Sequence, residues 1–173
     1  MTASADRPAG RAMVREAGPD DIPEIIRTTN EAYAVESFCI RGERTDVADV
    51  AYRMGTGAFL VVDGEKPGEL LGSVYMAFPK AGRGYLGILA VDPKAQGRGI
   101  SRLLVEAVEA RCRAAGCLFL DLTVVNLRKE LFPFYAKLGF TASDVLPFPR
   151  TEKLIQPCRL VQMTKALRPL DAL

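Results

Sequence analysis

The residues from Leu89 to Ser101 have types and a spacing that favour the binding of a phosphate group. The apolar stretch Leu89–Val91 is expected to end a strand, and a helix is expected to begin beside Gly97 and Gly99. The first N–H groups of a helix have no partner within it, and the helix dipole makes that end electropositive. Glycines let an anion approach the backbone closely, and successive N–H groups can form an anion-binding concavity.

The side chains of Arg98 and Arg102 could add charge-assisted hydrogen bonds, because guanidinium groups match phosphate oxygens well. Two common nucleotide motifs do not fit. The P-loop of nucleoside triphosphatases needs a Lys followed by Ser or Thr, and no such pair follows these glycines. The dinucleotide-binding pattern needs a third glycine where Arg102 stands. A strand-to-helix turn whose glycines serve only packing is the structural alternative.

The spacing of Gln96, Gly99 and Ser101 closely resembles the acetyl-coenzyme A loop of the GNAT superfamily of N-acetyltransferases, whose pattern is Gln/Arg-x-x-Gly-x-Gly/Ala. Ser101 departs from the pattern but is small, so close approach of a ligand remains feasible. The resemblance implies acetyl-coenzyme A as co-substrate, with its pyrophosphate on backbone N–H groups of the loop and its arm along the preceding strand. The cofactor-binding residues that it implies are Leu89, Ala90, Val91, Gln96, Gly97, Arg98, Gly99, Ile100, Ser101, Arg102 and Asn126.

A second block, Phe134–Phe140, resembles the F-Y-x-x-L-G-F segment of the same superfamily. There the tyrosine commonly lies near the coenzyme A sulfur as general acid, which implies this role for Tyr135. A phenol with a pKa of about 10 can protonate a departing thiolate of similar basicity. The alternative is a core tyrosine whose hydroxyl is bonded nearby.

Asn126 ends an expected strand, where many relatives have an Asn that binds the pantetheine arm. Its separation from Tyr135 is slightly longer than is usual in the superfamily, and Pro133 lies between them. An Asn at a strand end is also a common cap or turn residue. The two alternatives for Asn126 stay open.

The general base is the least defined part of the expected site, because Gly87 stands where many relatives have a Glu. Glu36 is the acid that we select. The acids near the first helix also suggest a cationic amine as acceptor, although such residues are commonly just solvated. A neutral amine, or one deprotonated by water, would need no base. The acids that could serve are Glu31, Glu36, Glu43, Asp46 and Asp121.

The composition fits one globular domain, with 173 residues, 49% of them hydrophobic and 25% charged. The net charge of +2 gives no reason to expect a nucleic acid or membrane partner, and there is no apolar run long enough to cross a bilayer. Four dispersed cysteines and no histidine argue against a metal site, a Ser-His triad and a Cys-His pair. We therefore expect no metal and a cytoplasmic location.

The expected fold is α+β, with a disordered tail at 1–12 and a single domain at 13–173. Hydrophobic periodicity predicts strands at 13–17, 58–62, 70–78, 85–91, 118–125, from 139 and at 159–164. It predicts helices from Asp21, acting as N-cap, at 47–54, from 100 with Gly116 as its C-cap, and in part of 127–138, where Pro133 should bend or restart the helix. This order resembles the GNAT fold. The resemblance implies a mixed sheet of six to seven strands, helices on both faces, and parallel fourth and fifth strands that splay apart.

The function that these features favour is direct transfer of an acetyl group from acetyl-coenzyme A to a primary amine. A small molecule or a peptide could supply that amine, and a homodimer is left open. The rival hypothesis is a non-catalytic module that binds an acyl-coenzyme A, which the glycine at 87 keeps open. A mononucleotide-binding protein is a third alternative, which the absent P-loop lysine disfavours.

Overall fold

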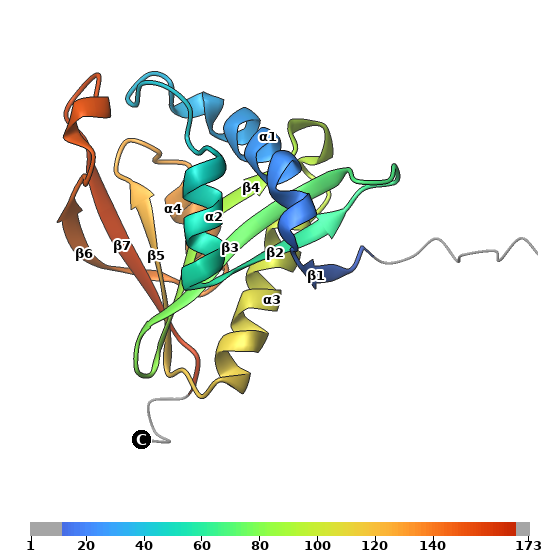
Figure 1. The fold of residues 1–173 in the computed structure, drawn as a ribbon. Coiled ribbons are helices and arrows are strands. Elements are labelled where there is room, and N and C mark those ends of the chain that lie inside the picture. The colour runs from blue at the N-terminus through green and yellow to red at the C-terminus, as the bar shows by residue number, and fades with distance from the viewer. Residues whose placement is uncertain (1–11, 169–173) are drawn as a thin grey trace, which may run out of the picture.

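The computed structural model describes residues 12–168, so nearly all of the expected tail at 1–12, and residues 169–173, lie outside it. Within the described residues, seven strands form one mixed sheet in the order β1-β2-β3-β4-β5-β7-β6 (Figure 1). The strands are β1 (Val14–Glu16), β2 (Ala58–Asp63), β3 (Leu70–Lys80), β4 (Arg83–Val91), β5 (Phe119–Val125), β6 (Thr141–Pro147) and β7 (Arg159–Ala166). The helices are α1 (Ile22–Tyr33), α2 (Val47–Thr56), α3 (Ile100–Ala114) and α4 (Leu131–Lys137), with 3-10 turns η1 (Pro19–Asp21), η2 (Ala34–Glu36), η3 (Pro93–Ala95) and η4 (Thr151–Lys153).

Helices cover both faces of the sheet, which confirms the expected layers (Figure 1). On one face, α1 and α2 bury Ile25 and Val50 against the sheet. On the other face, α3 buries a stripe that includes Leu104 and Val108, and α4 packs beside it through Tyr135. The helical period brings such apolar residues onto one side of each helix, so each helix is positioned by burial of that side.

The parallel strands β4 and β5 pair only at their first residues, Arg83–Tyr85 with Phe119–Asp121, and then diverge as expected. A bulge lies just beyond this point, because Ile88 and Leu89 together oppose Val74 of β3. Ile88 has φ of 46°, a left-handed conformation that is rare for a β-branched residue. The edge of β4 that faces β5 is therefore free of strand partners beyond the paired residues.

Two local expectations are met only in part. Asp21 is the N-cap residue of α1 as expected, but its carboxylate makes no capping hydrogen bond: it accepts hydrogen bonds from the Gly18 N–H and from Arg15 instead. Pro133 does not bend the chain but lies where a helix restarts, since α4 begins at Leu131. It is the third residue of α4, and the first N–H groups of a helix have no intrahelical partner to lose.

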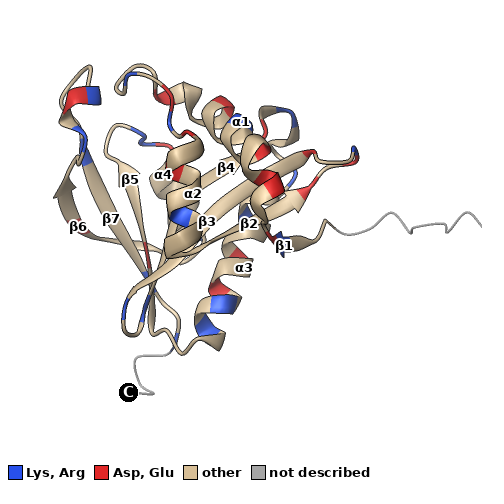
Figure 2. Ribbon diagram, in the orientation of Figure 1, with Lys and Arg blue, Asp and Glu red and all other residues tan. Residues whose placement is uncertain are grey.

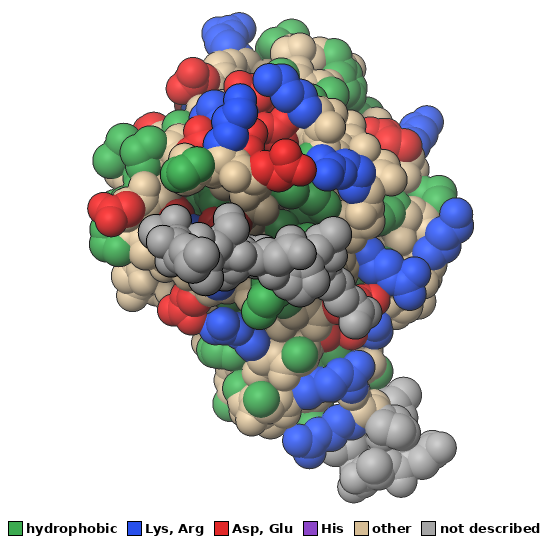
Figure 3. Space-filling model, turned by 90° about the vertical axis from the view of Figure 1, so that its right-hand side faces the viewer, with side chains coloured by type: hydrophobic (Ala, Val, Ile, Leu, Met, Phe, Trp, Pro, Cys, Tyr) green, Lys and Arg blue, Asp and Glu red, His purple; other side chains and the backbone are tan. Residues whose placement is uncertain are grey.

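Acidic and basic side chains are interspersed on the face shown in Figure 3, in keeping with the small net charge. Among residues 12–168, no helix combines the length and the apolar character needed to cross a membrane.

Candidate functional site

The loop between β4 and α3 has the open conformation that its glycines suggest. Gly97 and Gly99 both have φ of 78°, which a residue with a side chain rarely adopts. Apart from the adjoining residues, no heavy atom of residues 12–168 lies within 4 Å of the point that a Cβ would occupy on either glycine. The space in front of the backbone is therefore free for a ligand.

The backbone N–H groups from Gln96 to Arg102 are available as donors, because none of them pairs with an acceptor within residues 12–168. The first helical hydrogen bond of α3 runs from the Leu103 N–H to the Gly99 carbonyl, at 3.1 Å. A cavity of about 340 Å³ opens in front of these donors. Such a row of donors at a helix N-terminus suits an anionic group. The cavity is lined by Ala32, Tyr33, Leu89, Val91, Ala95, Gln96, Gly97, Gly99, Ile100, Ser101, Arg102, Arg128, Leu131, Phe134 and Tyr135.

Three of the expected cofactor-binding residues, Ala90, Arg98 and Asn126, lie outside the lining of this cavity. Ala90 is buried opposite Ser73 and does not line the cavity, so any role would belong to its backbone. Arg98 is not part of the lining, whereas Arg102 lines the cavity and pairs with Glu106 at 2.9 Å.

Asn126 also lies outside the lining. Its side-chain Oδ1 accepts the Arg159 N–H at 2.8 Å, and its own N–H donates to the Arg159 carbonyl at 2.9 Å. This geometry matches the turn residue that the sequence offers as one of its two alternatives for Asn126.

Asp92 fixes the start of the loop. Its buried carboxylate accepts the Lys94 N–H at 2.9 Å and pairs with Arg27 of α1 at 3.0 Å. Burial alone would raise the pKa of Asp92, but the hydrogen bonds from Lys94 and Arg27 outweigh it and hold the pKa below its usual value. The ion pair therefore ties the loop to the helix that covers the opposite face.

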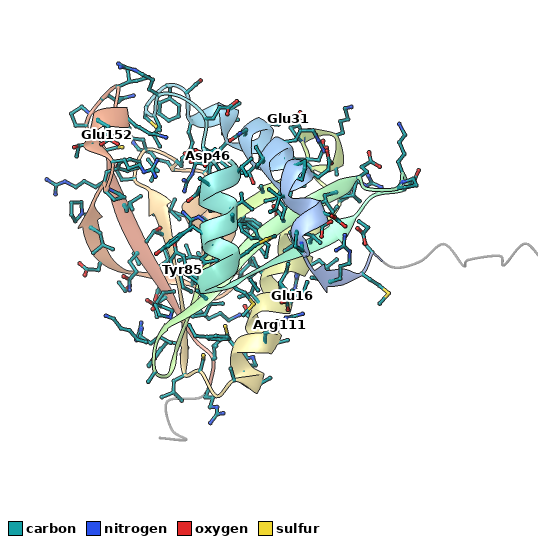
Figure 4. All side chains as sticks on the ribbon, viewed as in Figure 1. Glu16, Glu31, Asp46, Tyr85, Arg111 and Glu152 are labelled. Atoms are coloured by element: carbon teal, nitrogen blue, oxygen red, sulfur yellow. The ribbon has the colours of Figure 1, made fainter. Side chains whose placement is uncertain are left out.

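Replacing Arg27 with Gln should lower the free energy of unfolding by about 1–3 kcal/mol, because it leaves a buried carboxylate without its cation. Since the pKa of Asp92 is lowered in the folded protein, the pair stabilises the fold at neutral pH, and this contribution disappears as the pH falls through the acid range. Urea denaturation at pH 7 and at low pH measures both effects. Arg111→Gln is the control, since it removes the exposed pair with Glu16 (Figure 4) and should cost about 0–1 kcal/mol.

Tyr135 lies where two cavities meet, because it lines the loop cavity and also a second cavity of about 520 Å³. Its ring packs edge-on against Phe134 and Phe140, at centroid distances of 5.0 and 5.9 Å. No protein group within residues 12–168 bonds its hydroxyl. Burial raises the pKa of Tyr135. The hydroxyl therefore stays protonated at neutral pH and is free to donate to a bound group.

The second cavity opens between the α1–α2 segment, the β6–β7 loop and the diverging ends of β4 and β5. Glu36 of η2 is buried at its wall and pairs with Arg128 of the facing cavity at 2.9 Å. Burial raises the pKa of Glu36 above its usual value despite this pair. The lining consists of Tyr33, Glu36, Ile40, Glu43, Arg44, Thr45, Asp46, Asp49, Arg53, Tyr85, Gly87, Ile88, Thr123, Val124, Val125, Leu131, Tyr135, Phe148, Pro149, Arg150, Lys153 and Leu160.

Tyr85 occupies the place that a side chain at position 87 would take. A Cβ on Gly87 would lie 2.7 Å from a ring carbon of Tyr85 and 3.2 Å from its hydroxyl. The ring projects beside α2 (Figure 4), and its hydroxyl lies 3.4 Å from Thr123 Oγ1. The Tyr85 ring therefore fills the space beside Gly87 in which a glutamate side chain would lie. Tyr85 was not among the residues predicted from the sequence.

The other acids considered as bases divide into two groups. Glu43 and Asp46 line the second cavity, whereas Asp121 and Glu31 do not. Asp121 pairs with Arg83 at 2.7 Å and accepts a hydrogen bond from Thr164. Burial would raise the pKa of Asp121, but these bonds hold it below the usual value. The carboxylate therefore stabilises the pairing of neighbouring strands and is a poor candidate for a base. Glu31 pairs with Arg27 instead.

Among residues 12–168, no group of three or more His, Cys, Asp or Glu side chains is arranged to hold a metal ion. The model of the acetyltransferase (GNAT) family matches residues 24–140, which run from α1 to the residue before β6. The chain belongs to the GNAT acetyltransferase family. The resemblance seen in the two sequence blocks is thereby confirmed.

Curated relatives of this GNAT chain include two mycothiol acetyltransferases. That of Mycolicibacterium paratuberculosis is 34% identical over 149 residues, covering 75% of this chain and 46% of the relative. That of Gordonia bronchialis is 32% identical over 130 residues, covering 72% and 41%. The chain therefore spans less than half the length of these relatives.

Solved structures confirm the GNAT fold. Ard1 from Thermoplasma volcanium superimposes with a TM-score of 0.74 at 21% identity, covering 91% of this chain and 99% of the other. Naa20 from Chaetomium thermophilum, in complex with a bisubstrate analogue, gives a TM-score of 0.71 at 19% identity, covering 89% and 86%. At these identities the likeness concerns the fold alone.

Proposed function

We propose that this protein is an acetyl-coenzyme A-dependent N-acetyltransferase that moves the acetyl group directly to a primary amine. The observation that carries the proposal is the position of Tyr135 between an anion-suited cavity and a second, separate cavity. Membership of the GNAT family supports the same activity. A cytoplasmic location fits the four free, buried cysteines, because thiols stay reduced there.

The residues present fit the co-substrate, because unpaired backbone N–H groups and an open loop are what a pyrophosphate requires. Acetyl-coenzyme A supplies an activated thioester. The N–H groups from Gln96 to Arg102 would hold its pyrophosphate. The unpaired edge of β4 beyond Tyr85 would bond the amides of its arm, as an added strand would.

Tyr135 would give its hydroxyl proton to the sulfur as the C–S bond breaks and the amine nitrogen forms its bond to the carbonyl carbon. The amine would attack in its neutral form. The proton that its nitrogen then loses would go to Glu36 or to water, and Tyr135 would regain a proton from solvent. A backbone N–H of Leu89, Ala90 or Val91 would polarise the thioester carbonyl. Holding both reactants at this junction would supply much of the rate enhancement.

Glu36→Gln should lower kcat by about tenfold at neutral pH, less than the 10²-fold typical of a general base, since some amines arrive neutral. Because burial raises the pKa of Glu36, activity that depends on its ionised form is lost as the pH falls through that raised pKa. The variant should lack this acid limb in the profile of kcat against pH. Asp121→Asn is the control, because Asp121 lies outside both cavities, and its profile should match the wild type. An unchanged limb in Glu36→Gln would remove Glu36 from the mechanism.

The proposed activity is tested by release of free thiol from acetyl-coenzyme A when amines are added to the pure protein. The panel should contain small primary amines and short peptides with free N-termini. We expect release that depends on both the amine and the enzyme. Tight binding of acetyl-coenzyme A without thiol release across the panel would instead identify a non-catalytic binding module.

A further inference from the structure

Three of the four acidic side chains that line the second cavity are engaged within the protein, and exposed Glu43 is the exception. Glu36 pairs with Arg128 at 2.9 Å, and Asp49 pairs with Arg53 at 3.1 Å and accepts the Thr45 hydroxyl. Asp46 caps α2 by accepting the Asp49 N–H. These carboxylates therefore offer little free negative charge to a cationic acceptor, contrary to what the sequence suggested.

Three cations on the same lining lack such partners. Within residues 12–168, no carboxylate lies within ion-pair distance of Arg44, Arg150 or Lys153. The Arg44 guanidinium lies over the Tyr33 ring, 5.2 Å from its centroid. The Lys153 ammonium contacts only a backbone carbonyl, that of Glu43, at 3.5 Å. These three cations are thus free to bind an external anion, although Glu43 and Asp46 line the same cavity.

The backbone, and not a counter-ion, brings these cations together. Ile40 and Leu154 form an isolated β-bridge between the α1–α2 segment and the β6–β7 loop. The Arg41 N–H donates to the Lys153 carbonyl at 2.7 Å, and the Ile155 N–H donates to the Cys39 carbonyl at 3.0 Å. Figure 2 shows basic segments on both loops. Holding like charges near one another is unfavourable unless an anion joins them.

We propose that the acceptor is an amine that also carries an anionic group, a carboxylate or a phosphate. Arg44, Arg150 and Lys153 bind that group at the mouth of the cavity, while the amine reaches Tyr135 at its inner end. Guanidinium groups suit both anions, since they donate in a planar fork. This assignment rests on the proposed acetyltransferase function and specifies the substrate class of the same site.

The test compares kcat/KM for matched amines that differ in charge. One set is 5-aminopentanoate, pentylamine and 1,5-diaminopentane, and the other is phosphoethanolamine and ethanolamine. The anionic member of one or both sets should exceed its neutral counterpart by about ten- to a hundred-fold, the effect of hydrogen bonds to charged groups. A larger preference in the first set would indicate a carboxylate, and a larger preference in the second set would indicate a phosphate. The preference should shrink as salt is added.

The double variant Arg150→Gln/Lys153→Gln should abolish most of this preference without changing the Kd for acetyl-coenzyme A. Arg41→Gln is the control, because it removes a positive charge from the α1–α2 segment that is hydrogen-bonded to Lys153 but lies outside the lining. Its preference should equal that of the wild type. Equal or better use of the neutral or dicationic amines by the wild type would overturn the assignment, while leaving the acetyltransferase activity established.

If no amine of the panel is acetylated, binding of product analogues decides the question. Protein saturated with coenzyme A is titrated, by NMR, with 5-acetamidopentanoate and with the neutral 5-acetamidopentanamide. Shifts near Lys153 for the carboxylate alone, absent in the double variant, support an anion site. The same response to both compounds, or to neither, would overturn it. Failure of acetyl-coenzyme A itself to bind would instead contradict the proposed function.

Discussion

Replacing Tyr135 with Phe is expected to lower kcat by about 10²- to 10⁴-fold, the usual contribution of a positioned general acid. The Kd for acetyl-coenzyme A should stay unchanged, because the ring and its packing against Phe134 and Phe140 are retained. Only the hydroxyl group is lost, and no protein group depends on that hydroxyl for a hydrogen bond within residues 12–168. Steady-state kinetics with the best amine of the panel, together with calorimetry, measure the two effects separately.

Tyr52→Phe is the control for this variant, since Tyr52 lies exposed on α2 outside both cavities. It should keep the wild-type kcat. Because burial raises the pKa of Tyr135, its acid form should persist through the neutral and mildly alkaline range, and kcat should not fall there. Wild-type turnover in Tyr135→Phe would exclude the acid role.

The second large effect is expected from Gly99→Val, which should weaken acetyl-coenzyme A binding by about 10²-fold or more. A β-branched side chain does not tolerate φ of 78°, so the loop must change its conformation. The rearranged backbone would then misdirect the N–H groups that face the cavity. Isothermal titration calorimetry gives the Kd.

Gly68→Val separates this effect from simple backbone strain. Gly68 also has φ of 78° with no atom within 4 Å of its Cβ position, but it lies in the β2–β3 loop, far along the chain from the cavity lining. Both variants should lose about 1–3 kcal/mol of stability in urea denaturation. Only Gly99→Val should lose binding, and equal Kd values for the two would argue against the loop as the phosphate site.

The strands and helices along the chain were predicted well, because they depend on local periodicity, whereas their arrangement in a mixed sheet came from the family resemblance. The continuous apolar run at 58–62 marks a strand covered on both faces, and the stripe along 100–112 fixes which side of that helix is buried. The departure of β4 from β5 was expected from the family resemblance and was confirmed. The hydrogen bonds that side chains make at turns were harder to predict from the sequence. Asp21 looks like a cap in sequence, yet Arg15 and Gly18 engage its carboxylate from positions that no local pattern reveals.

The site was only partly predictable for the same reason. Gly97, Gly99 and Tyr135 could be predicted because each belongs to a short contiguous motif. The filling of the space above Gly87 by Tyr85 depends on the direction of a ring, which the sequence does not specify. The charge state of the acceptor cavity depends on pairs such as Glu36 with Arg128, 92 residues apart in the chain. Counting acids along the chain does not reveal such long-range pairs.

The most direct test of the account is calorimetric titration of the folded protein with acetyl-coenzyme A. We predict saturable binding of one molecule per chain, weakened by added salt as expected where backbone donors hold a diphosphate. ATP, which shares a phosphate chain but lacks the pantetheine arm, should bind more weakly. Absence of binding heat from a protein shown to be folded, or tighter binding of ATP, would contradict the account.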